Sequence, residues 1–202
     1  MTESEYQELI ERVLPCPALV SGTDSSQLCL RIVPPGHRLE ERELLVVLRA
    51  RGKELELELI QPEPALAHSA VKAKTAQPEH WMETMEIHLR RWRTSDSKLI
   101  EQILGKSWRN TGLRVMPPEV WLTDPTTYYL RAQSMAGTVA IAISGPGSEA
   151  TRQLSAFLTW AERVRTRAQA MLKERGTLKE NTRDAGFGSF DFEVDAVRGS
   201  GL

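Results

Sequence analysis

The chain has 202 residues, of which 41% are hydrophobic and 26% charged, and its formal net charge at pH 7 is −1. This length is typical of one domain that buries its own core, and the near-neutral charge excludes binding to nucleic acid or membranes through overall charge alone. No run of eighteen apolar residues occurs, and the first ten residues (MTESEYQELI) lack a signal-peptide pattern. We therefore expect a cytoplasmic protein without membrane insertion.

The first predicted element is an amphipathic helix near the N-terminus. Thr2 and Glu5 have the spacing of a capping box, in which each side chain bonds to the backbone of the other residue. The apolar residues that follow fall on one helical face: Tyr6, Leu9, Ile10 and Val13. Pro15 ends this helix because proline has no amide hydrogen to donate. Alternating apolar residues over 28–32 then predict a short strand.

The clearest local pattern is a β-hairpin formed by residues 43–50 and 54–60. In the second arm, leucines alternate with Glu54, Glu56 and Glu58, which predicts an apolar inner face and an acidic outer face. The Arg-Gly-Lys segment between the arms provides the turn. Because an acidic row of this kind protects a sheet edge or meets a basic partner, the three glutamates are candidate protein-binding residues.

The middle of the chain is predicted to contain helices and a second hairpin. Residues 61–78 are rich in proline and alanine and are predicted as a long connection. A helix is predicted over 79–93 from an apolar stripe that is more typical of a core than of a cofactor site. The stripe consists of Trp81, Met85, Leu89 and Trp92. A short helix is predicted over 99–104. Residues 126–133 and 138–144 form the second hairpin, and the apolar second arm is predicted as a central strand.

The longest predicted helix spans residues 148–175 and carries one continuous apolar face that includes Phe157 and Leu158. We therefore predict a single α+β domain over residues 1–176. In this domain, three strands and then two strands form one antiparallel sheet of about five strands, packed by helices and closed by the long C-terminal helix.

The last part of the chain, residues 177–202, is predicted as a flexible C-terminal tail. The tail is rich in glycine and has little helical periodicity. It also contains a strand-competent segment, because Phe190, Phe192 and Val194 alternate with acidic residues.

Motifs for catalysis, cofactors or metals are scarce. Cys16 and Cys29 lack the spacing of zinc ligands, and the four histidines form no metal-binding pair. Cys29 is expected to pack as a small apolar group, and a Cys16–Cys29 disulfide is the alternative. No nucleophile elbow or phosphate-binding loop occurs. We therefore expect a protein that is not an enzyme and that holds no cofactor and no metal, and an enzyme with a site that no motif marks is the alternative.

A glycine motif at Gly145, with the sequence GPGSEA, follows a predicted strand and opens a predicted helix. It matches the G-x-G-x-x-A pattern of dinucleotide sites. The dinucleotide site also needs a second parallel strand soon after the helix, which this sequence does not provide. We therefore predict a sharp strand-to-helix turn, and whether it binds an anion stays open.

The distribution of charge leaves other functions open. Residues 127–183 carry nine basic and four acidic residues, whereas residues 184–202 carry one basic and four acidic residues. An alternative function is therefore nucleic-acid binding by basic residues of two predicted helices. The candidates are Arg90, Arg91, Arg93, Arg163 and Arg167. A third arrangement has the acidic tail folded back on the basic helix or docked on a neighbouring subunit.

The order of elements resembles that of type III secretion chaperones of the Tir-chaperone type: helix, three strands, helical insert, two strands and long helix. The resemblance covers residues 2–175 and departs from the family pattern over 61–126 and in the tail. It implies a sheet with helices on one face, in a small, dimeric, non-catalytic protein that holds partner segments on its surface.

The expected function is therefore that of a chaperone, adaptor or assembly subunit. We expect its partner to be another protein or further copies of itself, in a homo-oligomer such as a homodimer. The candidate contact residues are Glu54, Glu56, Glu58, Phe187, Phe190, Phe192 and Val194.

Overall fold

A computed structural model describes residues 1–16, 25–51, 53–106, 126–134, 137–144 and 152–181. The strands are β1 (Ser25–Val33), β2 (Leu44–Arg51), β3 (Glu54–Pro62), β4 (Ile87–Thr94), β5 (Thr127–Ser134), β6 (Gly137–Ser144) and β7 (Thr177–Asn181). The helices are α1 (Glu3–Val13), α2 (Leu66–Ala76), α3 (Trp81–Thr84), α4 (Ser97–Leu104) and α5 (Arg152–Arg175). The described helices include no candidate for a membrane-spanning segment, by length and hydropathy together.

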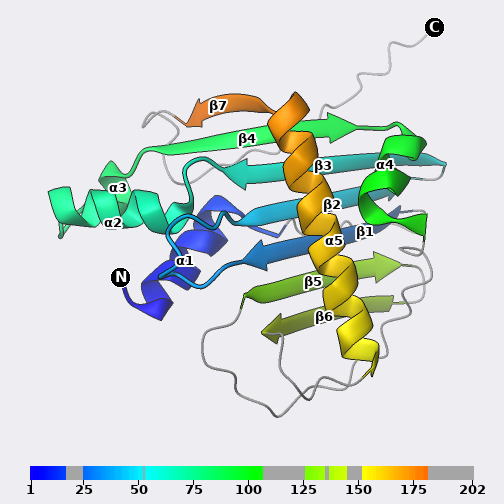
Figure 1. Cartoon of the computed structure of the whole chain (residues 1–202), viewed down its shortest axis with the longest axis horizontal. Coiled ribbons are helices and arrows are strands. Elements are labelled where there is room, and N and C mark those ends of the chain that lie inside the picture. Colours follow the sequence, from blue (N-terminus) through cyan, green and yellow to red (C-terminus); the bar gives the residue numbers. More distant parts are fainter. Residues whose placement is uncertain (17–24, 52, 107–125, 135–136, 145–151, 182–202) are drawn as a thin grey trace, which may run out of the picture.

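The strands form one antiparallel sheet in the order β6-β5-β1-β2-β3-β4-β7 (Figure 1). The five predicted strands correspond to β1, β2, β3, β5 and β6, which lie next to one another in the sheet in the order β6-β5-β1-β2-β3. The predicted α+β class, with a single antiparallel sheet and a long C-terminal helix, is therefore confirmed. Two further strands, β4 and β7, extend the sheet beyond β3.

Two predictions for residues 61–93 are wrong. The predicted connection contains helix α2, and residues 87–93 of the predicted 79–93 helix lie in strand β4, which pairs with β3 from Leu89 to Thr94. The segment Trp81–Thr84 is helical, as helix α3. The apolar stripe was read with a helical period, but it divides between the two faces of the sheet. Leu89 packs with Trp81 and Met85 on one face, whereas Trp92 packs on the other.

The two edges of the sheet also differ from the sequence prediction. Strand β7 pairs with β4 from Ile87 to Arg91, so the folded domain extends at least to Asn181 instead of ending at residue 176. Strand β6 was predicted as a central strand, but it pairs only with β5 among the described strands and forms the other edge of the sheet. The order of the described strands therefore leaves a strand without charged residues at one edge.

One face of the sheet is covered by α4 and α5, and α5 runs across the strands (Figure 1). Phe157 and Leu158 of α5 are buried there, as the sequence predicted, together with Leu30 and Leu59 of the sheet. The Trp160 indole Nε1 donates a hydrogen bond of 2.7 Å to the backbone oxygen of Leu104, which joins α5 to the end of α4.

The opposite face of the sheet is covered by α1, α2 and α3. The predicted capping box of Thr2 and Glu5 is present, and the predicted apolar face of α1 is fully buried. It packs with Val47 and Ile60 of the sheet and with Leu66 of α2. Helices therefore lie on both faces of the sheet, and the expectation of helices on one face is wrong.

A buried carboxylate, that of Glu43, ties this second layer to the sheet. Helix α2 begins after Ala65, whose side chain has no hydrogen-bonding group to cap the helix. Instead, Glu43 Oε2 accepts a hydrogen bond of 2.9 Å from the backbone nitrogen of Leu66, and Oε1 accepts one from the hydroxyl of Tyr6. Burial raises the pKa of Glu43, although these hydrogen bonds favour its charged form.

Candidate functional site

The acidic row of β3 does not face solvent along its whole length. Glu54 and Glu56 are exposed, as predicted, but Glu58 is completely buried, with an exposed fraction of 0%. Its carboxylate lies 2.9 Å from Arg93 Nε and 3.3 Å from Arg49 Nη1. The prediction that Glu58 points outward to a partner is therefore wrong, because arginines of the neighbouring strands surround it.

The basic residues of β4 are the reason for this burial. Glu58 lies directly opposite Arg93 in the β3–β4 register, and Arg91 Nη1 lies 4.0 Å from the same carboxylate. Burial and the neighbouring Arg93 lower the pKa of Arg91, and the attraction of Glu58 opposes this shift. Glu58, predicted to bind protein, and Arg91 and Arg93, predicted to bind nucleic acid, thus lie side by side and neutralise one another in part.

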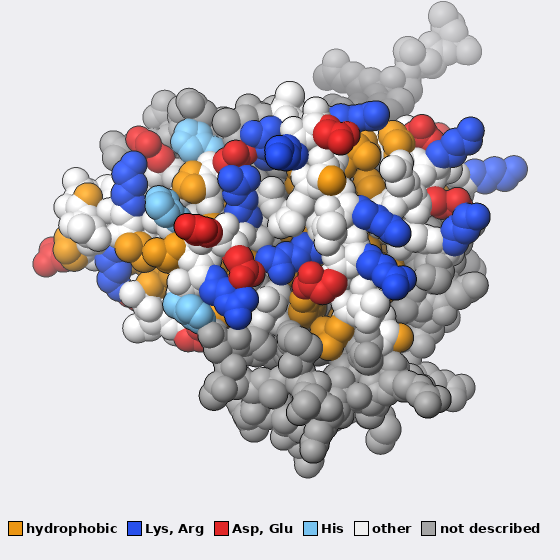
Figure 2. Space-filling view, viewed as in Figure 1, with side chains coloured by type: hydrophobic (Ala, Val, Ile, Leu, Met, Phe, Trp, Pro, Cys, Tyr) orange, Lys and Arg blue, Asp and Glu red, His pale blue; other side chains and the backbone are white. Residues whose placement is uncertain are grey.

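The five candidate nucleic-acid-binding arginines do not form one surface. Arg90 lies on the α5 side of the sheet, where its Nε is 2.6 Å from Glu63 Oε2 and its Nη1 donates to the Gly176 backbone oxygen at 3.2 Å. Arg163 and Arg167 are exposed on α5. On the face that α5 covers, basic side chains are interspersed with acidic ones (Figure 2). Arg90 therefore lies near α5, whereas Arg91 and Arg93 lie at the Glu58 carboxylate.

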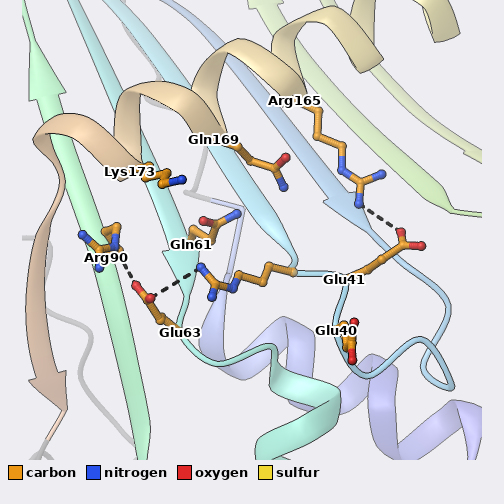
Figure 3. A pocket seen from close by; sticks show the side chains of 9 residues that line it. Glu40, Glu41, Gln61, Glu63, Arg90, Arg165, Gln169 and Lys173 are labelled. Carbon is orange, nitrogen blue, oxygen red and sulfur yellow. Dashed lines mark hydrogen bonds and ion pairs between the residues drawn. The ribbon is translucent and has the colours of Figure 1, made fainter.

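A polar cleft lies beside the C-terminal half of α5 (Figure 3). Its volume is about 540 Å³. Arg165, Gln169 and Lys173 line one wall, because residues four apart share one face of a helix. Residues 40–42, which precede β2, form the opposite wall, and the floor is formed by β4 and the end of β3. Four segments of the chain therefore meet at this cleft.

Ion pairs hold the walls of the cleft together. Arg165 Nη2 lies 3.1 Å from Glu41 Oε2 and joins α5 to the opposite wall. Arg42 Nη1 lies 3.5 Å from Glu63 Oε1, so Glu63 bridges Arg42 and Arg90. The hydrogen bond from Arg90 lowers the pKa of Glu63, and Arg42 adds to the effect. The cleft therefore has a fixed, charged frame.

One side chain in the cleft lacks the partner that its burial demands. Gln61 is 4% exposed, and its Nε2 has no hydrogen-bond partner among the described residues. No sequence pattern predicts this site, because Gln61 follows the Leu–Glu alternation as an ordinary polar residue. The regular spacing of Arg165, Gln169 and Lys173 was the one available signal, and it is also typical of a solvated helix face.

The remaining candidates are placed as follows. The Cys16 and Cys29 Sγ atoms lie 2.9 Å apart as thiols, with Cys29 buried. Within the described ranges, no three His, Cys, Asp or Glu side chains are grouped to hold a metal ion. The motif at Gly145 and the tail candidates lie outside the described residues, the latter being Phe187, Phe190, Phe192 and Val194.

Comparisons of the chain with protein-family models, curated proteins and solved structures each found no match. A functional assignment therefore depends on the geometry of this chain alone.

Proposed function

We propose that this chain is a non-enzymatic protein-binding protein, a chaperone, adaptor or assembly subunit that acts in the cytoplasm, and that it associates through strand β6. The observation that supports the proposal is the place of β6 at an edge of the sheet, paired with β5 alone among the described strands. The sequence of β6, GTVAIAIS, has no charged residue and no proline. Edge strands without such residues favour pairing with another strand.

The partner proposed for β6 is a second copy of the same chain. Two antiparallel β6 strands would pair through the same surface on both copies, which gives a closed dimer with twofold symmetry. The opposite edge is less suited to pairing, because β7 has only five residues and its sequence, TLKEN, contains Lys179 and Glu180. The resemblance in element order to dimeric secretion chaperones points to the same class of function.

The proposal is tested by measuring molar mass with light scattering after size-exclusion chromatography. We expect a dimer for the natural sequence and a monomer for Ala142→Lys, because a lysine on the edge strand opposes pairing. The matched control is Thr177→Lys on β7, which is expected to remain a dimer. Thermal unfolding followed by circular dichroism verifies that both variants fold. A natural sequence that is monomeric at every concentration, or a control that dissociates like Ala142→Lys, would contradict pairing through β6.

A second candidate, nucleic-acid binding, is favoured by one observation. Arg163 and Arg167 are exposed one turn apart on α5, and neither forms an ion pair with the residues that the structure describes. This function predicts that Arg163→Gln combined with Arg167→Gln weakens oligonucleotide binding and reduces its dependence on salt. The measurement is gel retardation at low and moderate salt. The absence of retardation at low salt for the natural sequence would exclude this candidate.

A further inference from the structure

The cleft beside α5 contains hydrogen-bond donors that nothing in the described structure uses. Gln61 is only 4% exposed, and its Nε2 points into the cleft without a hydrogen-bond partner among the described residues (Figure 3). A buried amide donor without an acceptor is unfavourable, because it has lost its bonds to water and gained none in return. The floor of the cleft therefore offers an unused donor to an incoming acceptor.

The charges around this donor leave one cation available. Glu41 and Glu63 are already held by arginines, at 3.1 Å from Arg165 and 2.6 Å from Arg90. Lys173, on the α5 wall, forms no ion pair with any residue in the described ranges. Glu40 is the remaining acid, and Figure 3 shows it at the far side of the cleft from Lys173. The Lys173 end of the cleft therefore carries a positive charge that is not compensated locally.

The kind of anion that fits follows from these two groups. A phosphate is best held by arginines that donate in pairs, but the arginines of this cleft are already engaged with glutamates. One ammonium group and one amide donor suit the two oxygens of a carboxylate, which carries a single negative charge. We infer that the cleft is a binding site for a carboxylate-bearing ligand, held by Gln61 Nε2 and the Lys173 ammonium group.

Two sources can supply the carboxylate. One is a free small carboxylic acid, for which a cleft of about 540 Å³ is large enough. The other is the C-terminal part of this chain, whose residues 184–195 include Asp184, Asp191, Glu193 and Asp195. Strand β7 ends at Asn181, opposite Ile87 of β4, the strand that supplies Arg90 to the cleft. Three extended residues span about 10 Å, which is the length of strand between Asn181 and Leu178, the residue paired with Arg90.

The first arm of the test uses sodium glutarate, a five-carbon dicarboxylate, with the full chain. The reporter is the side-chain amide resonance of Gln61, assigned by its absence from the Gln61→Glu variant. We expect glutarate, but not sodium chloride at the same ionic strength, to shift this resonance to saturation. Lys173→Gln should weaken binding about tenfold, since it removes a charge-assisted hydrogen bond. Lys98→Gln, at an exposed position on α4, is the matched control and should leave binding unchanged.

The second arm distinguishes the two sources by neutralising the acids of the C-terminal segment. The variant combines Asp184→Asn, Asp191→Asn, Glu193→Gln and Asp195→Asn in the full chain. If the segment occupies the cleft, this variant shifts the Gln61 resonance without any additive and binds glutarate more tightly. If the ligand is a free carboxylate, the resonance and the affinity for glutarate stay as in the natural sequence.

Two results would overturn the assignment. One is a Gln61 resonance that responds neither to glutarate nor to neutralisation of the segment. The other is a Lys98→Gln variant that loses as much affinity as Lys173→Gln, which indicates general charge screening and not a site. The Gln61 resonance and the affinity for glutarate are independent of the molar mass. This inference and the proposed pairing through β6 can therefore be contradicted separately.

Discussion

At the scale of single residues, Glu43 connects the sheet to two helices through one carboxylate. It accepts hydrogen bonds from the Tyr6 hydroxyl of α1 and from the Leu66 backbone nitrogen of α2, and it is completely buried. Because burial disfavours the charged form, the pKa of Glu43 is higher in the folded protein than its ordinary value of 4.5. The folded state therefore holds a proton on Glu43 at a pH where the unfolded chain has already released it.

This shift predicts a pH dependence that Glu43→Gln should remove. A raised pKa in the folded state gives a contribution to stability that is complete below pH 4.5 and is lost as pH rises through the folded pKa. The free energy of unfolding of the natural sequence should therefore fall relative to that of Glu43→Gln as the pH rises above 4.5. Urea unfolding of both proteins across this range measures the difference. A difference that stays constant with pH would contradict the raised pKa.

The burial of polar residues such as Glu43 could not be predicted from the sequence. Glu43, Glu58 and Gln61 look like ordinary surface residues, because each stands among polar neighbours or in a regular alternation. Their burial arises from segments that are distant in the chain: α1 and α2 for Glu43, β4 for Glu58, and α5 for Gln61. No local pattern contains this information, so the candidate cleft was not predictable from periodicity or motif.

At the scale of elements, strong local periodicity was a reliable guide and sparse periodicity was not. Helix α1 and the β2–β3 hairpin were predicted from regular spacing, and both are present. Strand β4 was mistaken for a helix because Met85, Leu89 and Trp92, spaced by four and three residues, match one helical face, whereas in the strand Leu89 and Trp92 lie on opposite faces of the sheet. This segment is a strand because it pairs with β3 on one side and with β7 on the other. Such pairing depends on the whole sheet and not on the local sequence.

The junction between α5 and β7 carries a testable constraint at Gly176. A Cβ atom at this position would lie 2.5 Å from the Leu172 backbone oxygen and 2.6 Å from Arg90 Cγ. Gly176→Ala should therefore lower the free energy of unfolding by about 2 kcal/mol, because backbone and side chain must shift to admit the methyl group. Urea unfolding provides the measurement.

The matched control for this substitution is Gly36→Ala. Its added methyl group would meet the Tyr6 ring at 3.1 Å, a contact that a small movement of the ring relieves. We expect Gly36→Ala to cost clearly less than Gly176→Ala. Equal costs would show that the close approach of Leu172 and Arg90 does not limit the junction.

At the scale of the whole molecule, one sheet separates two hydrophobic cores. The run from Leu44 to Leu48 is apolar at every position, which is typical of a strand that is covered on both faces. In the structure, Leu44 and Val46 belong to the core under α5, whereas Leu45 and Val47 belong to the core under α1 and α2. The apolar run in β2 therefore already indicated that helices cover both faces of the sheet, although the resemblance to secretion chaperones implied helices on one face.

Because the two cores share the same strands, they should unfold together. Trp81 belongs to the core under α1 and α2, and Trp160 packs against the core under α5. In variants that retain only one of these tryptophans, its fluorescence reports the unfolding of one core. We expect the same urea midpoint for both reporters. Leu9→Ala, which empties part of the core around α1, should lower the free energy of unfolding by about 3 kcal/mol with either reporter. A Trp160 transition that keeps its midpoint in this variant would mean that α5 and its core are stable without the helices on the opposite face.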